Sequence, residues 1–261
     1  MRFSYETVSQ KVIFGAGDHK LLPGILDDFG WQRLVLCTSP RLRENGSIEM
    51  IFSSLEEKVV AVFDQTASHV PDAQVAEALA AARESSCDVV VSLGGGSAIG
   101  LAKAVSFELS AGKQFEQRKA DLVVPTIAIP TTYAGSEMTP VFGVTRQESG
   151  GTKRKITKRD RRITPKVALY DPLLTMDLPS ELTAASGVNA LAHCIEAVYS
   201  KTRNPLSTAC ALRGIELIKK ALPVCVEDVQ NLTARSELLE CAHLAGLALA
   251  TVSMGIHHGT G

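Results

Sequence analysis

At 261 residues, the chain can bury a sizeable core and form one large domain or two modest ones. Its 27 lysines and arginines nearly balance 28 aspartates and glutamates, so the charge gives no reason to expect a nucleic-acid partner or an anionic membrane surface. The sequence shows no signal peptide and no apolar run long enough to span a bilayer. We therefore expect a cytoplasmic protein whose six cysteines are buried free thiols.

The first half of the chain alternates short β-rich runs with helical patterns, the clearest of which covers residues 73–84. Fully apolar strands separated by helices indicate a parallel sheet that is covered on both faces. The predicted strands lie at 11–14, 33–37, 58–63, 88–93, 122–129 and 166–171.

After Pro179 the pattern becomes helical, with helices beginning near Glu181, Pro205 and Ala234. We therefore predict a Rossmann-like α/β dinucleotide-binding domain over 1–178, followed by an all-α domain over 179–261. The chain stops at Gly261 inside a stretch rich in glycine and histidine, so we expect the helical domain to be truncated there.

The strongest local motif is a glycine run between a strand and a helix, formed by Gly94, Gly95, Gly96 and Ser97. Glycines allow close approach to a ligand, and a helix start presents free N–H groups and a positive dipole end. A plain turn with a serine cap is the alternative, but it does not need three consecutive glycines. The motif predicts phosphate binding without choosing among NAD(P), another nucleotide or a sugar phosphate.

A second polar loop, at 130–140, follows the predicted strand 122–129. Its hydroxyls come from Thr131, Thr132 and Ser136, at the carboxyl end of a sheet strand where open α/β sheets bind ligands. The alternative is a Thr/Ser-rich loop without a ligand. The basic tract 153–162 is either a solvated loop or a site for an anionic ligand.

Five segments occur in a characteristic order: GGGSAIGLAKA (94–104), PTTYAGSE (130–137), VALYDPLLTMDLP (167–179), GVNALAHCIEA (187–197) and GIHHGTG (255–261). Together they resemble the iron-containing alcohol dehydrogenase family. That resemblance implies an N-terminal dinucleotide domain, a C-terminal helical domain and a homodimer. It assigns the pyrophosphate to Gly95, Gly96 and Ser97, and it places Thr131, Thr132 and Lys155 beside the cofactor.

The same resemblance matches His193 and His258 to two metal-binding histidines of the family, while the third would lie past Gly261. Metal-dependent members carry an aspartate four residues before the first histidine, where this chain has Asn189. A neutral amide is a poorer ligand than a carboxylate for a hard divalent ion. Asn189 and the loop PTTYAGSE resemble the maleylacetate reductase branch, so we expect no metal.

The branch implies reduction of the activated C=C bond of maleylacetate, and of its chlorinated relatives, to 3-oxoadipate in aromatic-compound degradation. Hydride can add to that bond if donors stabilise the developing enolate, and a histidine can deliver the proton. Asn189, His193, His243 and His258 are the candidate groups, with His257 a possible neighbour. Alternatively, His243 is a core histidine bonded to a carbonyl. Lys155 and the arginines within 154–162 are candidates for binding the two substrate carboxylates.

The predicted second strand, 33–37, runs into Thr38 without an acidic residue, and Arg41 and Arg43 follow. Because no acid repels a 2′-phosphate, we expect either NADH or NADPH to be accepted. His19 and His69 are expected at the surface. The alternatives are a metal-dependent alcohol dehydrogenase of the same family, a lyase similar to dehydroquinate synthase, and a non-catalytic nucleotide-binding protein.

Overall fold

The computed structural model describes residues 2–110, 123–148 and 151–253, which form two compact units. The first, which we call the sheet unit, contains Gln10–Pro130 and Pro140–Tyr170. The second, the helical unit, contains Met1–Ser9, Thr131–Thr139 and Asp171–Gly261. The loop after the predicted strand 122–129 therefore groups with the later helices. The boundary expected after residue 178 stays a prediction.

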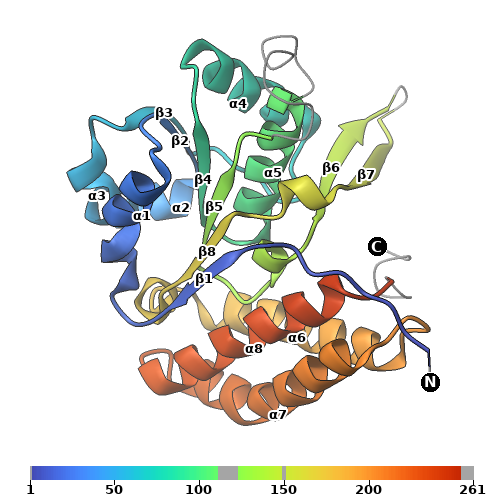
Figure 1. Ribbon diagram of the computed structural model, residues 1–261. Coiled ribbons are helices and arrows are strands. Elements are labelled where there is room, and N and C mark those ends of the chain that lie inside the picture. The colour runs from blue at the N-terminus through green and yellow to red at the C-terminus, as the bar shows by residue number, and fades with distance from the viewer. Residues whose placement is uncertain (1, 111–122, 149–150, 254–261) are drawn as a thin grey trace. The chain divides into compact units, whose positions relative to one another are not determined.

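Six parallel strands form the sheet unit's main sheet, in the order β1-β8-β5-β4-β2-β3 (Figure 1). All six predicted strands are present, although the fifth begins later than expected. They are β1 (Lys11–Phe14), β2 (Leu34–Cys37), β3 (Val59–Phe63), β4 (Val89–Gly94), β5 (Thr126–Pro130) and β8 (Val167–Tyr170).

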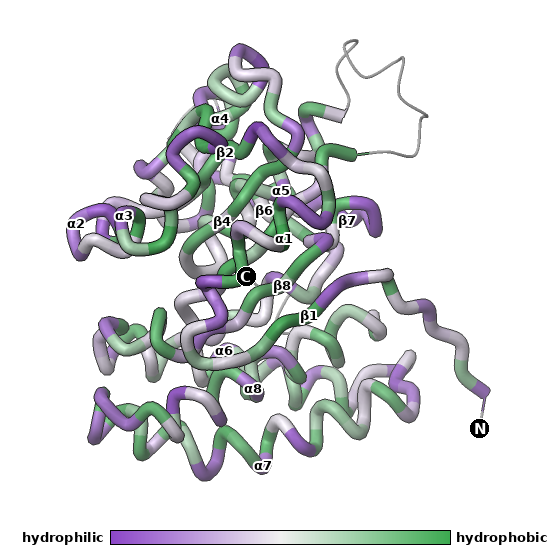
Figure 2. The backbone as a smooth tube through the Cα atoms, turned by 60° about the vertical axis from the view of Figure 1, so that its left-hand side comes forward, coloured by the Kyte–Doolittle hydropathy of each residue, from purple (hydrophilic) through white to green (hydrophobic). Residues whose placement is uncertain are grey.

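Helices cover both faces of this sheet. Every residue of β2 and of β4 is buried, which for side chains of alternating direction requires cover on each side. Figure 2 accordingly shows β4 and β8 as hydrophobic along most of their length. The predicted doubly covered parallel sheet is confirmed. The helices of this unit are α1 (Leu22–Phe29), α2 (Pro40–Glu44), α3 (Ser47–Phe52), α4 (Asp72–Glu84) and α5 (Gly96–Ser110).

The basic tract 153–162 is mainly a strand, so of the two alternatives given for it the solvated loop is not what forms. β6 (Val141–Gln147) and β7 (Lys153–Arg159) form an antiparallel hairpin. Pairing with β6 satisfies the backbone of this polar segment, although most of its side chains are exposed to solvent. Polar side chains carry no apolar alternation, which is why the strand gave no signal in the sequence.

The helical unit consists chiefly of α6 (Ser180–Tyr199), α7 (Pro205–Glu227) and α8 (Leu232–Ala250), which pack against one another. The predicted starts lie within two residues of the observed ones. Asparagine side chains accept hydrogen bonds at the starts of α7 and α8, and Pro205 occupies the first turn of α7. Figure 2 shows hydrophilic and hydrophobic stretches alternating along α7, as expected for a helix with one solvated face.

Two further expectations concern single side chains. All six cysteines are buried free thiols, as predicted, and burial raises the pKa of Cys37 to about 12. The surface position expected for His19 was wrong: its side chain is only 7% exposed, because the 3-10 turn η1 (Asp18–Leu21) packs against β8.

None of the helices in the described part of the chain is long and apolar enough to cross a membrane.

Candidate active site

The glycine run makes a tight connection between β4 and α5 in the sheet unit. Gly94 has a φ of +146°, and a Cβ atom there would lie 2.9 Å from the Cβ atom of Ala98. Both the backbone conformation and the available space therefore require glycine. The first helical hydrogen bond runs from the Ile99 N–H to the Gly95 carbonyl at 3.1 Å.

The start of α5 fits a phosphate group. The first N–H groups of a helix have no carbonyl partner within the helix, and they lie at the positive end of its dipole. Ser97 is the second residue of α5 and half-buried, so it does not occupy the capping position before the helix. Its hydroxyl is instead placed within the helix start, where anions bind.

Beside this loop, β2 ends at Cys37, and the fully buried Thr38 follows it. The Thr38 N–H donates to the Phe63 carbonyl at 2.8 Å, while the Thr38 hydroxyl has no hydrogen-bond partner among the described residues. At the end of β3, the carboxylate of Asp64 pairs with the guanidinium of Arg43. Asp64 was not among the residues expected near the cofactor, because it follows the third predicted strand rather than the second.

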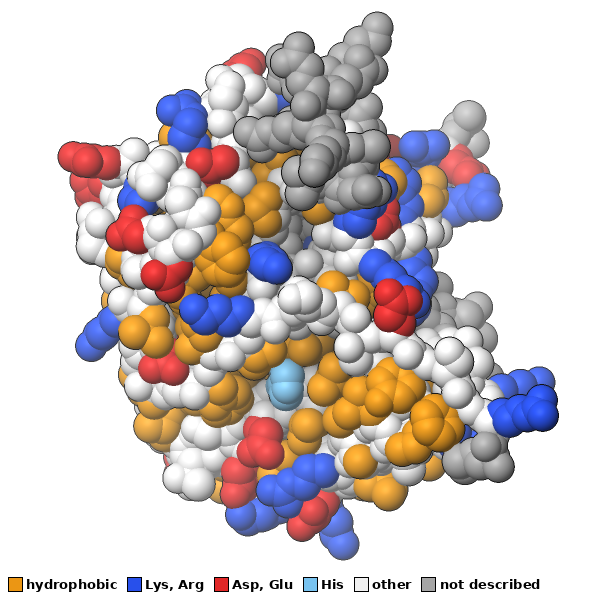
Figure 3. All heavy atoms as spheres, viewed as in Figure 1, with side chains coloured by type: hydrophobic (Ala, Val, Ile, Leu, Met, Phe, Trp, Pro, Cys, Tyr) orange, Lys and Arg blue, Asp and Glu red, His pale blue; other side chains and the backbone are white. Residues whose placement is uncertain are grey.

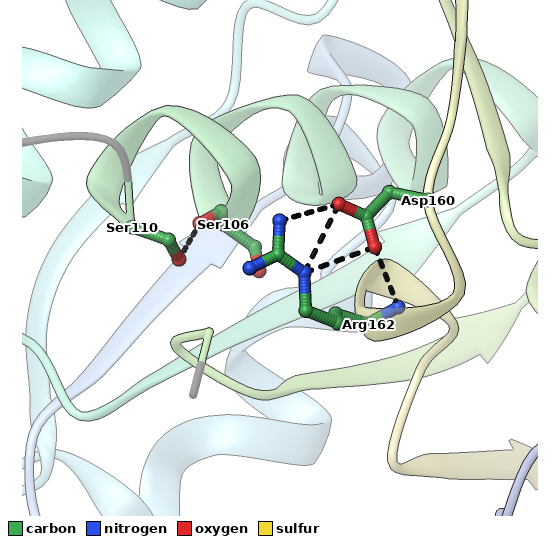
Figure 4. A network of polar contacts seen from close by, with 4 residues as sticks. All are labelled: Ser106, Ser110, Asp160 and Arg162. Atoms are coloured by element: carbon green, nitrogen blue, oxygen red, sulfur yellow. Dashed lines mark hydrogen bonds and ion pairs between the residues drawn. The ribbon is translucent and has the colours of Figure 1, made fainter. Parts of the chain in front are cut away.

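The basic side chains of the tract 153–162, on β7 and the turn after it, differ in their partners. Arg162 donates to both carboxylate oxygens of Asp160, at 2.6 Å and 3.1 Å, and these bonds hold the pKa of Asp160 below its usual value (Figure 4). Lys158 pairs with Glu108 at 2.8 Å. Lys155 is exposed, makes no ion pair with another described residue, and extends over Gly143 of the opposite strand. Lys155 is thus a better candidate than Arg162 for an incoming carboxylate.

In the helical unit, the loop Thr131–Thr139 packs on helix α8. Gly135 has a φ of +71°, and a Cβ atom there would lie 2.8 Å from the carbonyl oxygen of Ala242 and 3.1 Å from the nitrogen of Gly246. Thr131 is buried, and its hydroxyl has no hydrogen-bond partner among the described residues. Thr132 and Ser136 are half-buried. The loop thus carries polar groups on a backbone held close to α8.

Helix α6 presents Asn189 and His193 one turn apart. Residues four apart lie on the same side of a helix, so the amide and the imidazole are neighbours there. Asn189 is half-buried and His193 is 6% exposed. Glu196 follows on the same side and is 1% exposed. Sequence reasoning missed Glu196, although its distance of seven residues from Asn189 places it on that side by helical periodicity.

His243 lies on α8, next to Ala242, which contacts the Thr131–Thr139 loop. The side chain is half-buried, and burial lowers the pKa of His243 below its ordinary value of 6.5. The imidazole is therefore neutral at pH 7 and carries one N–H donor and one nitrogen acceptor.

The candidates thus fall into two groups. The sheet unit holds Thr38, the glycine run, Ser97 and Lys155, while the helical unit holds the Thr131–Thr139 loop with Asn189, His193 and His243. His257 and His258 lie outside the described residues. On the face that Figure 3 shows, basic and acidic side chains are interspersed rather than gathered by sign.

Two buried polar residues of the helical unit gave no signal in the sequence. Arg235 on α8 is fully buried, and so is Glu137 in the Thr131–Thr139 loop. Both side chains are charged types that local patterns assign to the surface, so only the packing of distant segments identifies them.

Asn189 changes the donor set that the family resemblance leads us to expect around His193. Asn189 offers a neutral amide oxygen at the place where an anionic ligand would be needed. Among the described residues, no group of three or more His, Cys, Asp or Glu side chains could hold a metal ion. His258, the second histidine that the resemblance matches to a metal ligand, lies outside the described residues, and the absence of a metal stays a prediction.

Family models match almost the whole chain. The model described as iron-containing alcohol dehydrogenase matches residues 9–172, and the C-terminal model of the Fe-containing alcohol dehydrogenase family matches residues 183–261. The chain therefore belongs to the iron-containing alcohol dehydrogenase family, a family of oxidoreductases.

Within that family, the chain is similar to maleylacetate reductases. It is 39% identical to one from Sphingobium indicum over 99% of this chain and 67% of the relative. A crystal structure of maleylacetate reductase from Agrobacterium tumefaciens matches with a TM-score of 0.86 and 34% identity, over 99% of this chain and 68% of that one. The sulfoacetaldehyde reductase of Bifidobacterium kashiwanohense, solved with NAD+, matches at a TM-score of 0.87 and 29% identity, over 97% and 68%. The predicted resemblance is confirmed, and the chain spans 64% to 68% of the length of its curated relatives.

Proposed function

We propose that this chain reduces the C=C bond of maleylacetate, and of chlorinated maleylacetates, to the corresponding 3-oxoadipate with NADH or NADPH and without a catalytic metal. The observation that carries the proposal is the pair Asn189 and His193 on one side of α6. An amide in that place suits a substrate whose double bond is already activated by a ketone and a carboxylate. The similarity to maleylacetate reductases supports the choice of substrate.

In this proposal, bound NAD(P)H supplies the hydride, and the residues of this chain do the rest. The start of α5 would hold the pyrophosphate through its backbone N–H groups. Asn189 and the neutral His243 donate hydrogen bonds to the oxygen on which enolate charge develops. A histidine then transfers a proton to carbon, so that the substrate gains one hydride and one proton in total. Lys155 pairs with a substrate carboxylate.

The experiment is NADH oxidation by the purified protein with maleylacetate, before and after exhaustive chelation. We expect turnover to survive chelation, and the purified protein to hold no stoichiometric zinc or iron. The matched variant is Asn189→Asp, which restores a carboxylate one turn before His193. It should bind added zinc more tightly than the parent, measured by equilibrium dialysis.

Each alternative function has its own outcome in this experiment. Turnover that chelation abolishes and iron or zinc restores would assign the chain to the metal-dependent alcohol dehydrogenases. Elimination of phosphate from a sugar-acid phosphate with no net NADH consumption would indicate a lyase. Cofactor binding without turnover of any dicarboxylate would indicate a nucleotide-binding protein.

We also propose that the protein is cytoplasmic and forms a homodimer. Membership of the iron-containing alcohol dehydrogenase family and the buried free thiols support the location. Light scattering on the purified protein tests the oligomeric state, and twice the 27.8 kDa mass of the chain is expected.

A further inference from the structure

Arg235 is the most deeply buried basic side chain among the described residues of the helical unit. Its side chain is 0% exposed, and its guanidinium donates four hydrogen bonds. A buried guanidinium is destabilising unless its donors are satisfied, and all four acceptors here are neutral oxygens. They are Val229 O at 3.0 Å, Leu178 O at 3.0 Å, the Tyr133 hydroxyl at 3.1 Å and Thr183 Oγ1 at 3.0 Å.

These bonds join the three segments that carry the candidate groups of this unit. Tyr133 belongs to the Thr131–Thr139 loop, Thr183 belongs to the first turns of α6, and Arg235 belongs to α8. A single Nη atom of Arg235 bonds both Tyr133 and Thr183. Any movement of the loop relative to α6 would therefore break one of two buried bonds.

A second contact holds the other part of the loop to the same side of α8. Gly135 packs against Ala242 and Gly246, which follow Arg235 by seven and eleven residues. Positions at these spacings share one side of a helix. The loop is thus attached to α8 at two places, and His243 lies directly beside the second.

We propose that Arg235 and Tyr133 are positioning residues, which hold the cofactor-side loop Thr131–Thr139 in register with His243 on α8 and with Asn189 and His193 on α6. The inference rests on the proposed function for the roles of these groups, although not for the contacts themselves. Tyr133 contributes its hydroxyl from a fully buried position, so its function is to fix the loop rather than to touch substrate.

The test compares three nearly isosteric variants. Tyr133→Phe removes the bond to the loop, Thr183→Val removes the bond to α6, and Ser106→Ala is the control. Ser106 donates to the Val124 carbonyl at 2.5 Å in the sheet unit, so its loss also removes a buried hydroxyl bond, but one far along α5 from the glycine run. Dissociation constants for NADH are measured by fluorescence, kcat and KM with maleylacetate, and melting temperatures by calorimetry.

We expect Tyr133→Phe and Thr183→Val to have different effects. Tyr133→Phe should raise the Kd for NADH about tenfold, as happens when the binding-competent loop is populated about a tenth of the time. Thr183→Val should leave that Kd within about twofold and lower kcat roughly tenfold or more, because misplaced catalytic groups slow the reaction. Ser106→Ala should lower the melting temperature alone.

If Tyr133→Phe and Thr183→Val change only the melting temperature, as Ser106→Ala does, the positioning role is wrong, whereas the proposed function stands as long as the parent protein reduces maleylacetate. If the parent binds NADH but does not reduce maleylacetate, the proposed function fails, and the NADH affinity of Tyr133→Phe still decides the inference. A parent that does not bind NADH overturns both.

Discussion

The loops Gly94–Ser97 and Thr131–Thr139 follow two neighbouring parallel strands, since Gly94 pairs with Pro130 in the sheet. Yet the two loops are held in different ways. The first depends on its own neighbours in sequence: the space at Gly94 is set by Ala98, four residues later. The second depends on α8, through a bond between side chains 102 residues apart and through Gly246.

This difference matters for how each loop responds to change. A loop defined by a strand end and a helix start keeps its shape as long as those two elements form, because its N–H groups are arranged by the helix itself. A loop defined by packing on a distant helix keeps its shape only while that packing is intact. Substitutions in the two loops should therefore affect stability and binding in different proportions.

The largest effect is expected for Gly135→Ala. The φ of +71° strains any residue with a Cβ by about 1–2 kcal/mol, and the contact with the Ala242 carbonyl adds about 1–3 kcal/mol of overpacking. We expect the free energy of unfolding in urea to fall by about 2–5 kcal/mol. Gly30→Ala is the matched control, because Gly30 has a φ of +72° and no heavy atom within 4 Å of the added Cβ. Equal losses in the two variants would show that α8 does not constrain the loop.

Gly94→Ala should have a smaller effect on stability and a larger one on binding. The φ of +146° strains a residue with a Cβ, for about 1–3 kcal/mol of unfolding free energy, while the contact with the Ala98 methyl at 2.9 Å is relieved by a shift of the first turn of α5. Because the same turn supplies the N–H groups for phosphate, NADH affinity should fall at least about tenfold. Titration of cofactor fluorescence measures this. Unchanged affinity would mean that the glycine run is only a turn.

The smallest effect concerns His243, beside the second loop. Burial holds the pKa of His243 below 6.5 in the folded protein, so the unfolded chain binds the proton more tightly. The contribution of the neutral imidazole to stability is therefore complete above pH 6.5. As the pH falls below that value, the free energy of unfolding decreases by less than about 1.4 kcal/mol per pH unit. His243→Gln should lose this dependence when urea unfolding at pH 7.5 and pH 5.5 is compared. The same slope in parent and variant would place the titration elsewhere.

Local chemistry was enough to predict much of this protein. Buried parallel strands are continuous apolar runs, so the strands at β2, β4 and β8 are visible in the sequence. The glycine run is visible for the same reason, since every residue that shapes it lies within a few positions. The starts of α6, α7 and α8 follow from prolines, caps and helical spacing.

Only the tertiary structure decided the rest. The hairpin strand β7 carries lysines and arginines on both faces, and its partner β6 makes it a strand. Asp64 became a neighbour of Thr38 because β3 lies beside β2. Arg235 is a charged residue with no local sign of burial, and its place was set by a tyrosine, a threonine and two carbonyls from elsewhere in the chain. Sequence patterns report what a residue prefers next to its neighbours, whereas a buried polar group is stable only when distant segments bring its partners to it.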